Sequence, residues 1–371
     1  MTQSRKKKTK KPTPIRVVVA DDSPFICRLL KQYLESDPFV KVIKTVLNGK
    51  QAMDAVGKLK PDVVTMDLDM PVLSGLDALE QIMVKRPTAV VLISGVGRQA
   101  ARMTSRGLSM GAVDFILKYT PGVTIPPDSL RREIIAKVKA AARIKVIRTI
   151  PSMDTRFAEM KRPKRPKAPE PEPDILRDIS HLVVVGASTG GPLALKDLLS
   201  SLKEDFPFPL LIVQHMPEGF TATMAAQFDR LFSFPVREAA QDEPLSPGTV
   251  LVAPGDRHLL ISPEGNIQIS RGSAINGHRP SIDVAMQSAA QAFGRYTTGV
   301  LLSGMGTDGT QGLLAIRHNG GATLAQSKET CVINTMPESA VRKGIVQQVG
   351  SPLEIGRWLT ERPDGVMPQR H

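Results

Sequence analysis

The chain has 371 residues, more than one ordinary domain contains, and 41% of them are hydrophobic, as in soluble globular proteins. Its apolar runs fall short of the roughly 18 residues that span a bilayer, and its basic N-terminus lacks the apolar core of a signal peptide. The formal net charge of +13 arises largely in two apolar-poor segments, residues 5–11 and 161–167, without interleaved aromatic residues, which argues against a specific nucleic-acid site.

The first fourteen residues form a basic tail that is expected to be disordered, and residues 15–145 then alternate strand-like and helix-like patterns. Strands are predicted at residues 16–20, 40–46, 62–66, 89–93 and 114–117. Helices are predicted to begin near Pro24, Lys50, Leu76, Gln99 and Asp128. This alternation predicts a five-stranded, doubly wound parallel α/β domain.

Residues 146–178 contain prolines among charges, which is typical of an extended linker. A second, larger α/β domain is predicted over residues 179–365. Its strands are expected near 182–185, 209–214, 250–252, 298–302 and 322–325. A turn at 263–266 between two apolar runs predicts an antiparallel hairpin within 258–270.

In the first domain, side chains that suit phosphoryl chemistry follow the predicted strands. Asp21 and Asp22 follow the first strand, Asp67 the third, Ser94 the fourth and Lys118 the fifth. The carboxyl ends of parallel strands meet at one edge, where converging carboxylates repel each other unless a divalent cation lies among them. Oxygen ligands of this kind suit Mg²⁺, and a lysine with a hydroxyl can hold phosphoryl oxygens. A single aspartate after a strand is usually a turn or cap residue, but five suitable residues at four strand ends disfavour that reading.

These residues make the segment similar to the receiver domain of response regulators. The matching strings are residues 20–23 and 67–71, with Ser94 and Lys118. The resemblance implies that Asp67 accepts a phosphoryl group from a histidine kinase. It also implies that Mg²⁺ is held by Asp21, Asp22, Asp67 and a backbone carbonyl near residue 69.

Two further positions follow from this resemblance. Phe115 occupies the aromatic switch position of the family. Tyr119 follows Lys118 where the family usually has proline, so the geometry of this loop is left open although the charge is kept.

In the second domain, a serine lies on a glycine-flanked turn. The run Gly186–Gly191 follows a buried strand and precedes a helical pattern that begins with Pro192. Such a turn exposes the Ser188 hydroxyl beside backbone N–H groups, which suits a nucleophile and equally a phosphate-binding turn.

The partners of Ser188 are sought at neighbouring strand ends. His215 ends the next predicted strand and is the candidate base, while Asp308, in a glycine-rich loop after the strand at 298–302, is the candidate acid. Asp308 could instead cap the helix that follows it. The amides of this loop, Met305 among them, are candidate oxyanion donors.

Two other interpretations fit less well. The order found in α/β-hydrolases would require Ser188 with Asp283 or Asp308 and then His318, which lies in a helical pattern. A dinucleotide site would need an acidic residue at the end of the second strand, where His215 follows glutamine instead.

The second domain resembles the catalytic domain of the chemotaxis protein-glutamate methylesterase family, CheB. The matching strings are residues 186–192, 214–217, 253–255, 278–283 and 302–309. The resemblance implies Ser188 as nucleophile, His215 as base and then acid, Asp308 as orienting carboxylate, and the Met305 and Thr189 amides as oxyanion donors. It also implies hydrolysis of glutamate γ-methyl esters and slower deamidation of glutamines on methyl-accepting chemoreceptors.

Together the domains predict an esterase controlled by phosphorylation, in which the receiver covers the serine site until Asp67 is modified. The expected partners are chemoreceptors and a chemotaxis histidine kinase, and the expected state is a cytoplasmic monomer without membrane insertion and without an esterase cofactor. Two cysteines far apart in sequence fit a reducing compartment. The alternatives are a phosphorylation-controlled binding module and a hydrolase of small esters that uses Asp283 as its acid.

Overall fold

The structure, a computed structural model, describes residues 13–118, 127–144 and 181–361. Most of the expected basic tail, the expected linker and Tyr119 lie outside the described residues. The described residues divide into two units, one with residues 13–94, 110–118 and 127–144 and the other with residues 95–109 and 181–361.

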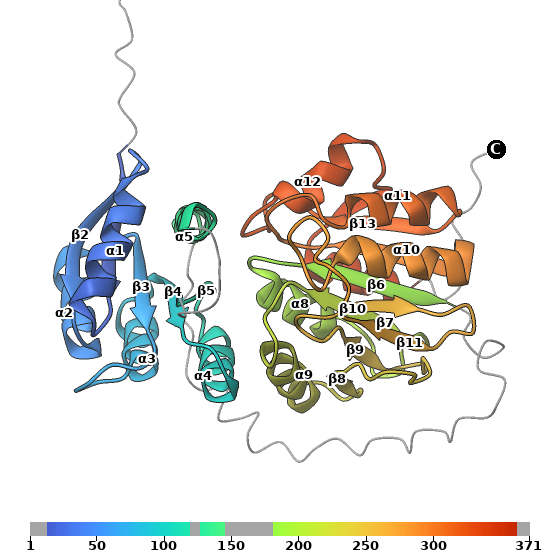
Figure 1. The fold of residues 1–371 in the computed structure, drawn as a ribbon, viewed down its shortest axis with the longest axis horizontal. Coiled ribbons are helices and arrows are strands. Elements are labelled where there is room, and N and C mark those ends of the chain that lie inside the picture. Colours follow the sequence, from blue (N-terminus) through green and yellow to red (C-terminus); the bar gives the residue numbers. More distant parts are fainter. Residues whose placement is uncertain (1–12, 119–126, 145–180, 362–371) are drawn as a thin grey trace, which may run out of the picture. The chain divides into compact units, whose positions relative to one another are not determined.

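The first unit contains a parallel sheet of five strands in the order β2-β1-β3-β4-β5 (Figure 1). The strands are β1 Ile15–Ala20, β2 Val40–Val46, β3 Val63–Asp67, β4 Ala89–Ser94 and β5 Asp114–Leu117. The helices are α1 Pro24–Glu35, α2 Gly49–Leu59, α3 Gly75–Lys85 and α5 Pro127–Ala141. Helix α1 begins as its sequence predicts, because Ser23 Oγ accepts a hydrogen bond from Ile26 N and Pro24 occupies the first turn.

The second unit contains a parallel sheet of seven strands in the order β14-β13-β12-β6-β7-β9-β8, and a separate antiparallel pair, β10 and β11. The strands are β6 Leu182–Ala187, β7 Leu210–Gln214, β8 Val236–Glu238, β9 Val250–Val252, β10 His258–Ile261, β11 Ile267–Ser270, β12 Thr297–Leu301, β13 Ala322–Gln326 and β14 Gln348–Gly350. The helices are α4 Arg98–Ser109, α8 Gly191–Ser200, α9 Phe220–Leu231, α10 Ile282–Phe293, α11 Thr310–His318, α12 Thr335–Arg342 and α13 Pro352–Glu361.

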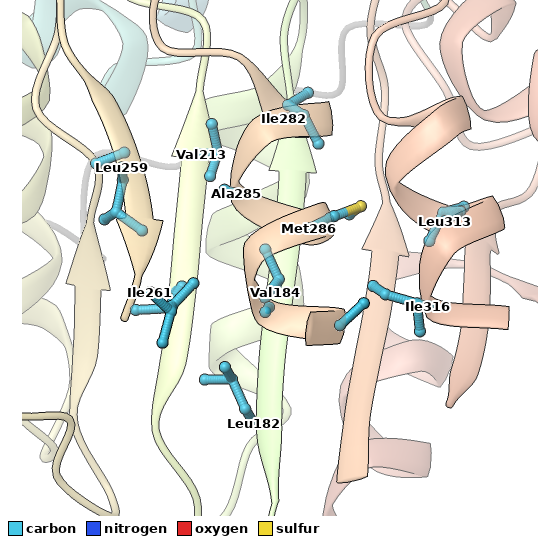
Figure 2. Packing of buried hydrophobic residues seen from close by; sticks show 14 of the residues in the cluster. Leu182, Val184, Val213, Leu259, Ile261, Ile282, Ala285, Met286, Leu313 and Ile316 are labelled. Atoms are coloured by element: carbon cyan, nitrogen blue, oxygen red, sulfur yellow. The ribbon is translucent and has the colours of Figure 1, made fainter. Parts of the chain in front are cut away.

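The core of the second unit fixes the start of α10 at the carboxyl edge of the sheet. Figure 2 shows Ala285 and Met286 of α10 packed among apolar side chains of the strands and of α11. The approach is close, since a Cβ built at Gly186 would lie 2.4 Å from Ile282 Cγ2. The first residue of α10, Ile282, therefore lies against the end of strand β6, directly before the serine turn.

The fold class predicted from the sequence is confirmed, including the antiparallel hairpin. Strands β8 and β14, of three residues each, lie at the two edges of the large sheet and were not predicted. Each holds a single valine among polar or small residues, Val-Arg-Glu and Gln-Val-Gly, and so gives no apolar run to recognise. Their absence from the prediction leaves the centre of the sheet, where the serine turn lies, unaffected.

Candidate active site

The serine turn lies at the point where the strand order of the large sheet changes direction. Strand β6 pairs with β12 on one side and with β7 on the other, so all three carboxyl ends meet there. Ser188 N donates to Ser303 O at 3.0 Å, and Gly191 N donates to Ser188 O at 2.8 Å. Gly190 has a φ of 75°, and a Cβ at that position would lie 2.4 Å from Val332 Cβ. The turn therefore requires glycine for both its backbone angle and its space.

His215 lies next to this turn because β7 is the neighbour of β6. Gln214 pairs with Ala187, and His215 N donates to Ala187 O at 3.0 Å. The ring Nε2 lies 2.8 Å from Asp308 Oδ2, and the two side chains are 10% and 0% exposed. The other ring nitrogen, Nδ1, is buried and has no hydrogen-bond partner among the described residues. Since Nε2 carries the proton and donates it in a hydrogen bond to the carboxylate, Nδ1 is left as a proton acceptor.

Asp308 is held by donors from the start of α10. Its carboxylate accepts hydrogen bonds from Ser281 Oγ at 3.0 Å, Ile282 N at 2.8 Å and Asp283 N at 3.1 Å. Burial alone would raise the pKa of Asp308. The hydrogen bond and charge of His215, together with the two amides, nevertheless hold that pKa well below its usual range. The carboxylate therefore stays charged beside the imidazole.

The interpretation of Asp308 as a cap of the following helix is wrong. Helix α11 has Gly309 at its N-cap position and no side-chain cap. Asp308 instead accepts hydrogen bonds from the first amides of α10. These amides are far from Asp308 in sequence but close to it in the fold.

The alternative set in hydrolase order is not assembled. Asp283 Oδ1 accepts a hydrogen bond from Gly312 N at 2.7 Å, and burial, with the neighbouring charge of Asp308, raises the pKa of Asp283. His318 is exposed at the end of α11. Neither Asp283 nor His318 forms a hydrogen bond with Ser188.

The glycine-rich loop after β12 packs directly on the serine. Ser303 Oγ donates to Thr189 O at 2.7 Å, and a Cβ built at Gly304 would lie 2.9 Å from Ser188 Cβ. The amides of Met305 and Thr189 donate to no other group in the part of the chain that the structure describes. Both therefore remain candidate donors to a group bound beside Ser188.

Ser188 Oγ and His215 share no hydrogen bond here, although both lie in the described residues. Such bonds are often long in enzymes without substrate and tighten when substrate binds. Ser188 and His215 are thus brought to adjacent strand ends, while His215 and Asp308 are already joined by a hydrogen bond.

Two supporting residues were missed by the sequence analysis. Gln214 Nε2 donates to Ser188 O at 2.9 Å and so braces the serine turn from β7. The ring of His278 stacks on His215 with centroids 3.9 Å apart and planes 8° apart. The only signal for either was its place in a string that matches the resembled family.

In the first unit, the predicted carboxylates lie together at the carboxyl edge of the small sheet. Oxygens of Asp21, Asp22 and Asp67 lie within 4.8 Å of one another. Lys118 Nζ lies 2.6 Å from Asp67 Oδ2 and 3.3 Å from Asp21 Oδ2. The three carboxylates supply the hard oxygen ligands that fit a divalent cation, while the Lys118 ammonium, which cannot ligate a metal, pairs with Asp67 and Asp21.

Burial is the largest influence on the pKa of Asp67. It raises the pKa of Asp67, even though the Lys118 ammonium acts in the opposite direction. Burial opposes the charge of Lys118, but its contacts with Asp67 and Asp21 raise the pKa of Lys118. An added cation would offset the cost of burying the carboxylates.

The remaining predicted receiver residues lie on β4 and β5. Ser94 is the buried last residue of β4, and its carbonyl accepts a hydrogen bond from Lys118 N at 2.6 Å. Phe115 is buried on β5, where Lys137 Nζ donates to its carbonyl at 2.6 Å and lies 5.3 Å from its ring centroid.

A cavity of about 860 Å³ lies elsewhere in the first unit, between α1, β2 and α2. It is lined in part by basic side chains, and none of the sequence-predicted site residues borders it. Among the described helices, none combines the length and the apolar character that crossing a membrane requires.

Comparison with known proteins identifies two family models in the chain. The model described as CheB methylesterase matches residues 183–359, and the model described as response regulator receiver domain matches residues 17–125. The two matches cover both sites described above.

Named relatives match nearly the whole chain. A protein of Symbiobacterium thermophilum named protein-glutamate methylesterase/protein-glutamine glutaminase is 39% identical over 347 residues, which cover 91% of this chain and 93% of the relative. A protein of Pseudomonas aeruginosa with the same name and the number 2 is 40% identical over 344 residues, covering 92% and 94%. The crystal structure of the Thermotoga maritima CheB methylesterase catalytic domain is 38% identical, with a TM-score of 0.48, and covers 49% of this chain and 97% of that domain.

Proposed function

The chain belongs to the CheB methylesterase family, and we propose that its Ser188, His215 and Asp308 hydrolyse glutamate γ-methyl esters on methyl-accepting chemoreceptors. The products are methanol and receptor glutamate. The same site deamidates receptor glutamines with release of ammonia, which matches the second half of the relatives' names. The substrate side chains lie on receptor segments in the cytoplasm, where the enzyme works.

The observation that carries the assignment is the 2.8 Å contact between His215 Nε2 and Asp308 Oδ2, made beside the serine turn. In the first step Ser188 Oγ attacks the ester carbonyl carbon while His215 Nδ1 takes the hydroxyl proton. The charged Asp308 stabilises the imidazolium that forms and keeps its ring in orientation. His215 then gives the proton to the departing methoxide, which leaves as methanol.

The negative charge that develops on the carbonyl oxygen needs donors that are already in place. The amides of Met305 and Thr189 are assigned this role, since both belong to segments in contact with Ser188 and donate to nothing else in the described chain. Each such donor typically contributes about 10²–10³ in rate.

In the second half-reaction water attacks the acyl-enzyme, with His215 now acting as general base. Serine is released and glutamate remains on the receptor. With a glutamine substrate the first leaving group is ammonia. The nitrogen of an amide is a poorer leaving group than the methoxide of a methyl ester. We therefore expect deamidation to be slower than ester hydrolysis.

The first unit is proposed to regulate the esterase. Asp67 is proposed as the acceptor of a phosphoryl group from a chemotaxis histidine kinase, with Lys118 and Ser94 holding the phosphoryl oxygens. Asp21, Asp22 and Asp67 would hold Mg²⁺, whose chemistry there is to neutralise charge on the entering phosphoryl group. Phe115 is proposed as the side chain that responds to the modification.

The test is methanol release from methylated receptor membranes by the full chain. Ser188→Ala is expected to abolish detectable turnover, because the proposed acyl-enzyme forms on the Ser188 hydroxyl. Ser200→Ala is the matched control, since Ser200 lies at the exposed end of α8 and its hydroxyl only bonds Asp197 O. Substantial methanol release by Ser188→Ala would overturn the assignment.

A further inference from the structure

A second histidine lies flat on the proposed base. The rings of His215 and His278 are 8° from parallel, with centroids 3.9 Å apart, which is close to the van der Waals thickness of two aromatic rings. His278 follows a tight Asn-Gly turn, in which Asn276 and Gly277 have φ angles of 52° and 81°. The turn is closed by hydrogen bonds between the backbones of Ile275 and His278.

The loop that carries His278 is held at both ends by a third histidine. His258, buried on β10, accepts a hydrogen bond at Nδ1 from Ser281 N at 3.2 Å. Its Nε2 therefore carries the proton and donates to Ser273 O at 3.0 Å. One ring thus fixes residues on either side of His278.

An ion pair fixes the loop from a second direction. Arg279 donates from Nε and Nη2 to Asp256 Oδ1, at 2.9 and 2.7 Å. Its Nη1 also donates to Gly272 O at 3.0 Å. The residue next to His278 is therefore tied both to the loop after β9 and to the start of its own loop.

We propose that His278 is a positioning residue for the general base. By stacking on His215 it limits rotation of the imidazole, so that Nε2 keeps its hydrogen bond with Asp308 and the buried Nδ1 stays available as a proton acceptor. This inference rests on the proposed function and deepens it, because it adds a fourth side chain that acts through His215 rather than on the substrate.

The electrostatics of the stack suit this role. Burial, the charge of His215 and, in the opposite sense, the charge of Asp308 combine to lower the pKa of His278 to about 4. At neutral pH its ring is therefore uncharged when His215 becomes an imidazolium. A neutral aromatic face attracts a cation, whereas a second imidazolium would repel it.

The experiment compares His278→Ala with His278→Phe in the full chain, by kcat and KM for methanol release from methylated receptor membranes. His278→Ala is expected to lower kcat by roughly tenfold to a hundredfold, as a misplaced catalytic group does, with KM within about twofold of wild type. His278→Phe keeps a flat ring on His215 and is expected to retain kcat within about threefold. His318→Ala is the matched control, because that histidine is exposed at the end of α11.

The results distinguish failure of the positioning role of His278 from failure of the proposed function. Wild-type kcat in His278→Ala, confirmed as folded by its thermal transition, would overturn the positioning role. Equal loss in both variants with a raised KM would also overturn it, since His278 would then contact the substrate through its ring nitrogens. Activity that persists in Ser188→Ala would instead overturn the proposed function on which the inference rests.

Discussion

At the scale of single residues, the carboxylate of Asp308 serves two structures at once. One oxygen contacts His215, and the group as a whole accepts from the first amides of α10. The positive end of the α10 dipole and these amides favour the charged carboxylate. The acid is therefore stabilised as an anion by the fold itself and can stabilise an imidazolium without taking its proton.

This arrangement predicts a large difference between two neighbouring aspartates. Asp308→Asn replaces an oxygen that accepts from His215 with an amide that favours the wrong tautomer, so kcat for methanol release is expected to fall by about 10³–10⁴. Asp283→Asn keeps an oxygen for Gly312 N and is expected to lower kcat by less than about tenfold. The measurement is the steady-state kcat of the two variants. If Asp308→Asn kept its activity while Asp283→Asn lost it, the interpretation as a small-ester hydrolase with Asp283 as the acid would be restored.

The sequence allowed these residues to be predicted because Ser188, His215 and Asp308 follow strands whose carboxyl ends share one edge. The supports around them follow no such pattern. His278 reaches His215 from a loop, and Ser281 reaches Asp308 through the start of a helix that packs on β6. Contacts of this kind depend on tertiary packing, which neither spacing nor periodicity encodes.

At the scale of elements, the strand–turn–helix unit of β6 and α8 is built on glycine. Gly190 has a φ in the left-handed region, and a Cβ at Gly191 would lie 1.9 Å from Gln214 Oε1. The backbone of this turn can therefore pack closely against both β7 and the segment around Val332. This close packing places Ser188 beside backbone amides that donate to no other group among the described residues.

This predicts opposite effects for two glycine-to-alanine changes. Gly190→Ala forces a left-handed backbone on alanine and a clash with Val332, so the second unit should lose at least about 1–3 kcal/mol and most of its esterase activity. Gly57→Ala, inside α2 with nothing within 4 Å of the added Cβ, should stabilise the first unit by about 0.5–1 kcal/mol. Differential scanning calorimetry measures both, and an unchanged transition in Gly190→Ala would contradict the role given to this glycine.

The elements themselves were largely predictable. The central strands are continuous apolar runs, as buried parallel strands must be, and the helix starts carry capping residues such as Ser23 and Ser281. The short edge strands β8 and β14 were not predictable, because at the sheet edges pairing with a single neighbour, rather than side-chain pattern, defines them.

At the scale of the whole molecule, one chain joins a site proposed to receive a phosphoryl group to a site proposed to hydrolyse esters. The pKa of a buried carboxylate is shifted in opposite directions at the two sites. Amides and His215 hold the pKa of Asp308 low, so it is charged whenever the esterase works. Burial raises the pKa of Asp67, so that carboxylate is costly to keep charged and gains from a cation or a covalent partner.

This difference predicts how metal removal and modification act on the full chain. A small-molecule phosphodonor with Mg²⁺ should raise the rate of methanol release, because modification of Asp67 shifts the population toward an active state. A chelator should abolish that rise while leaving the unstimulated rate unchanged, since Asp21, Asp22 and Asp67 are the residues that would hold the metal and none of them belongs to the esterase site. Asp67→Asn should respond to neither treatment, while Ser188→Ala should stay inactive under both. Equal rates with and without the phosphodonor in the wild type would reject regulation through Asp67, and a fall in the unstimulated rate on chelation would mean that a metal also supports the serine site.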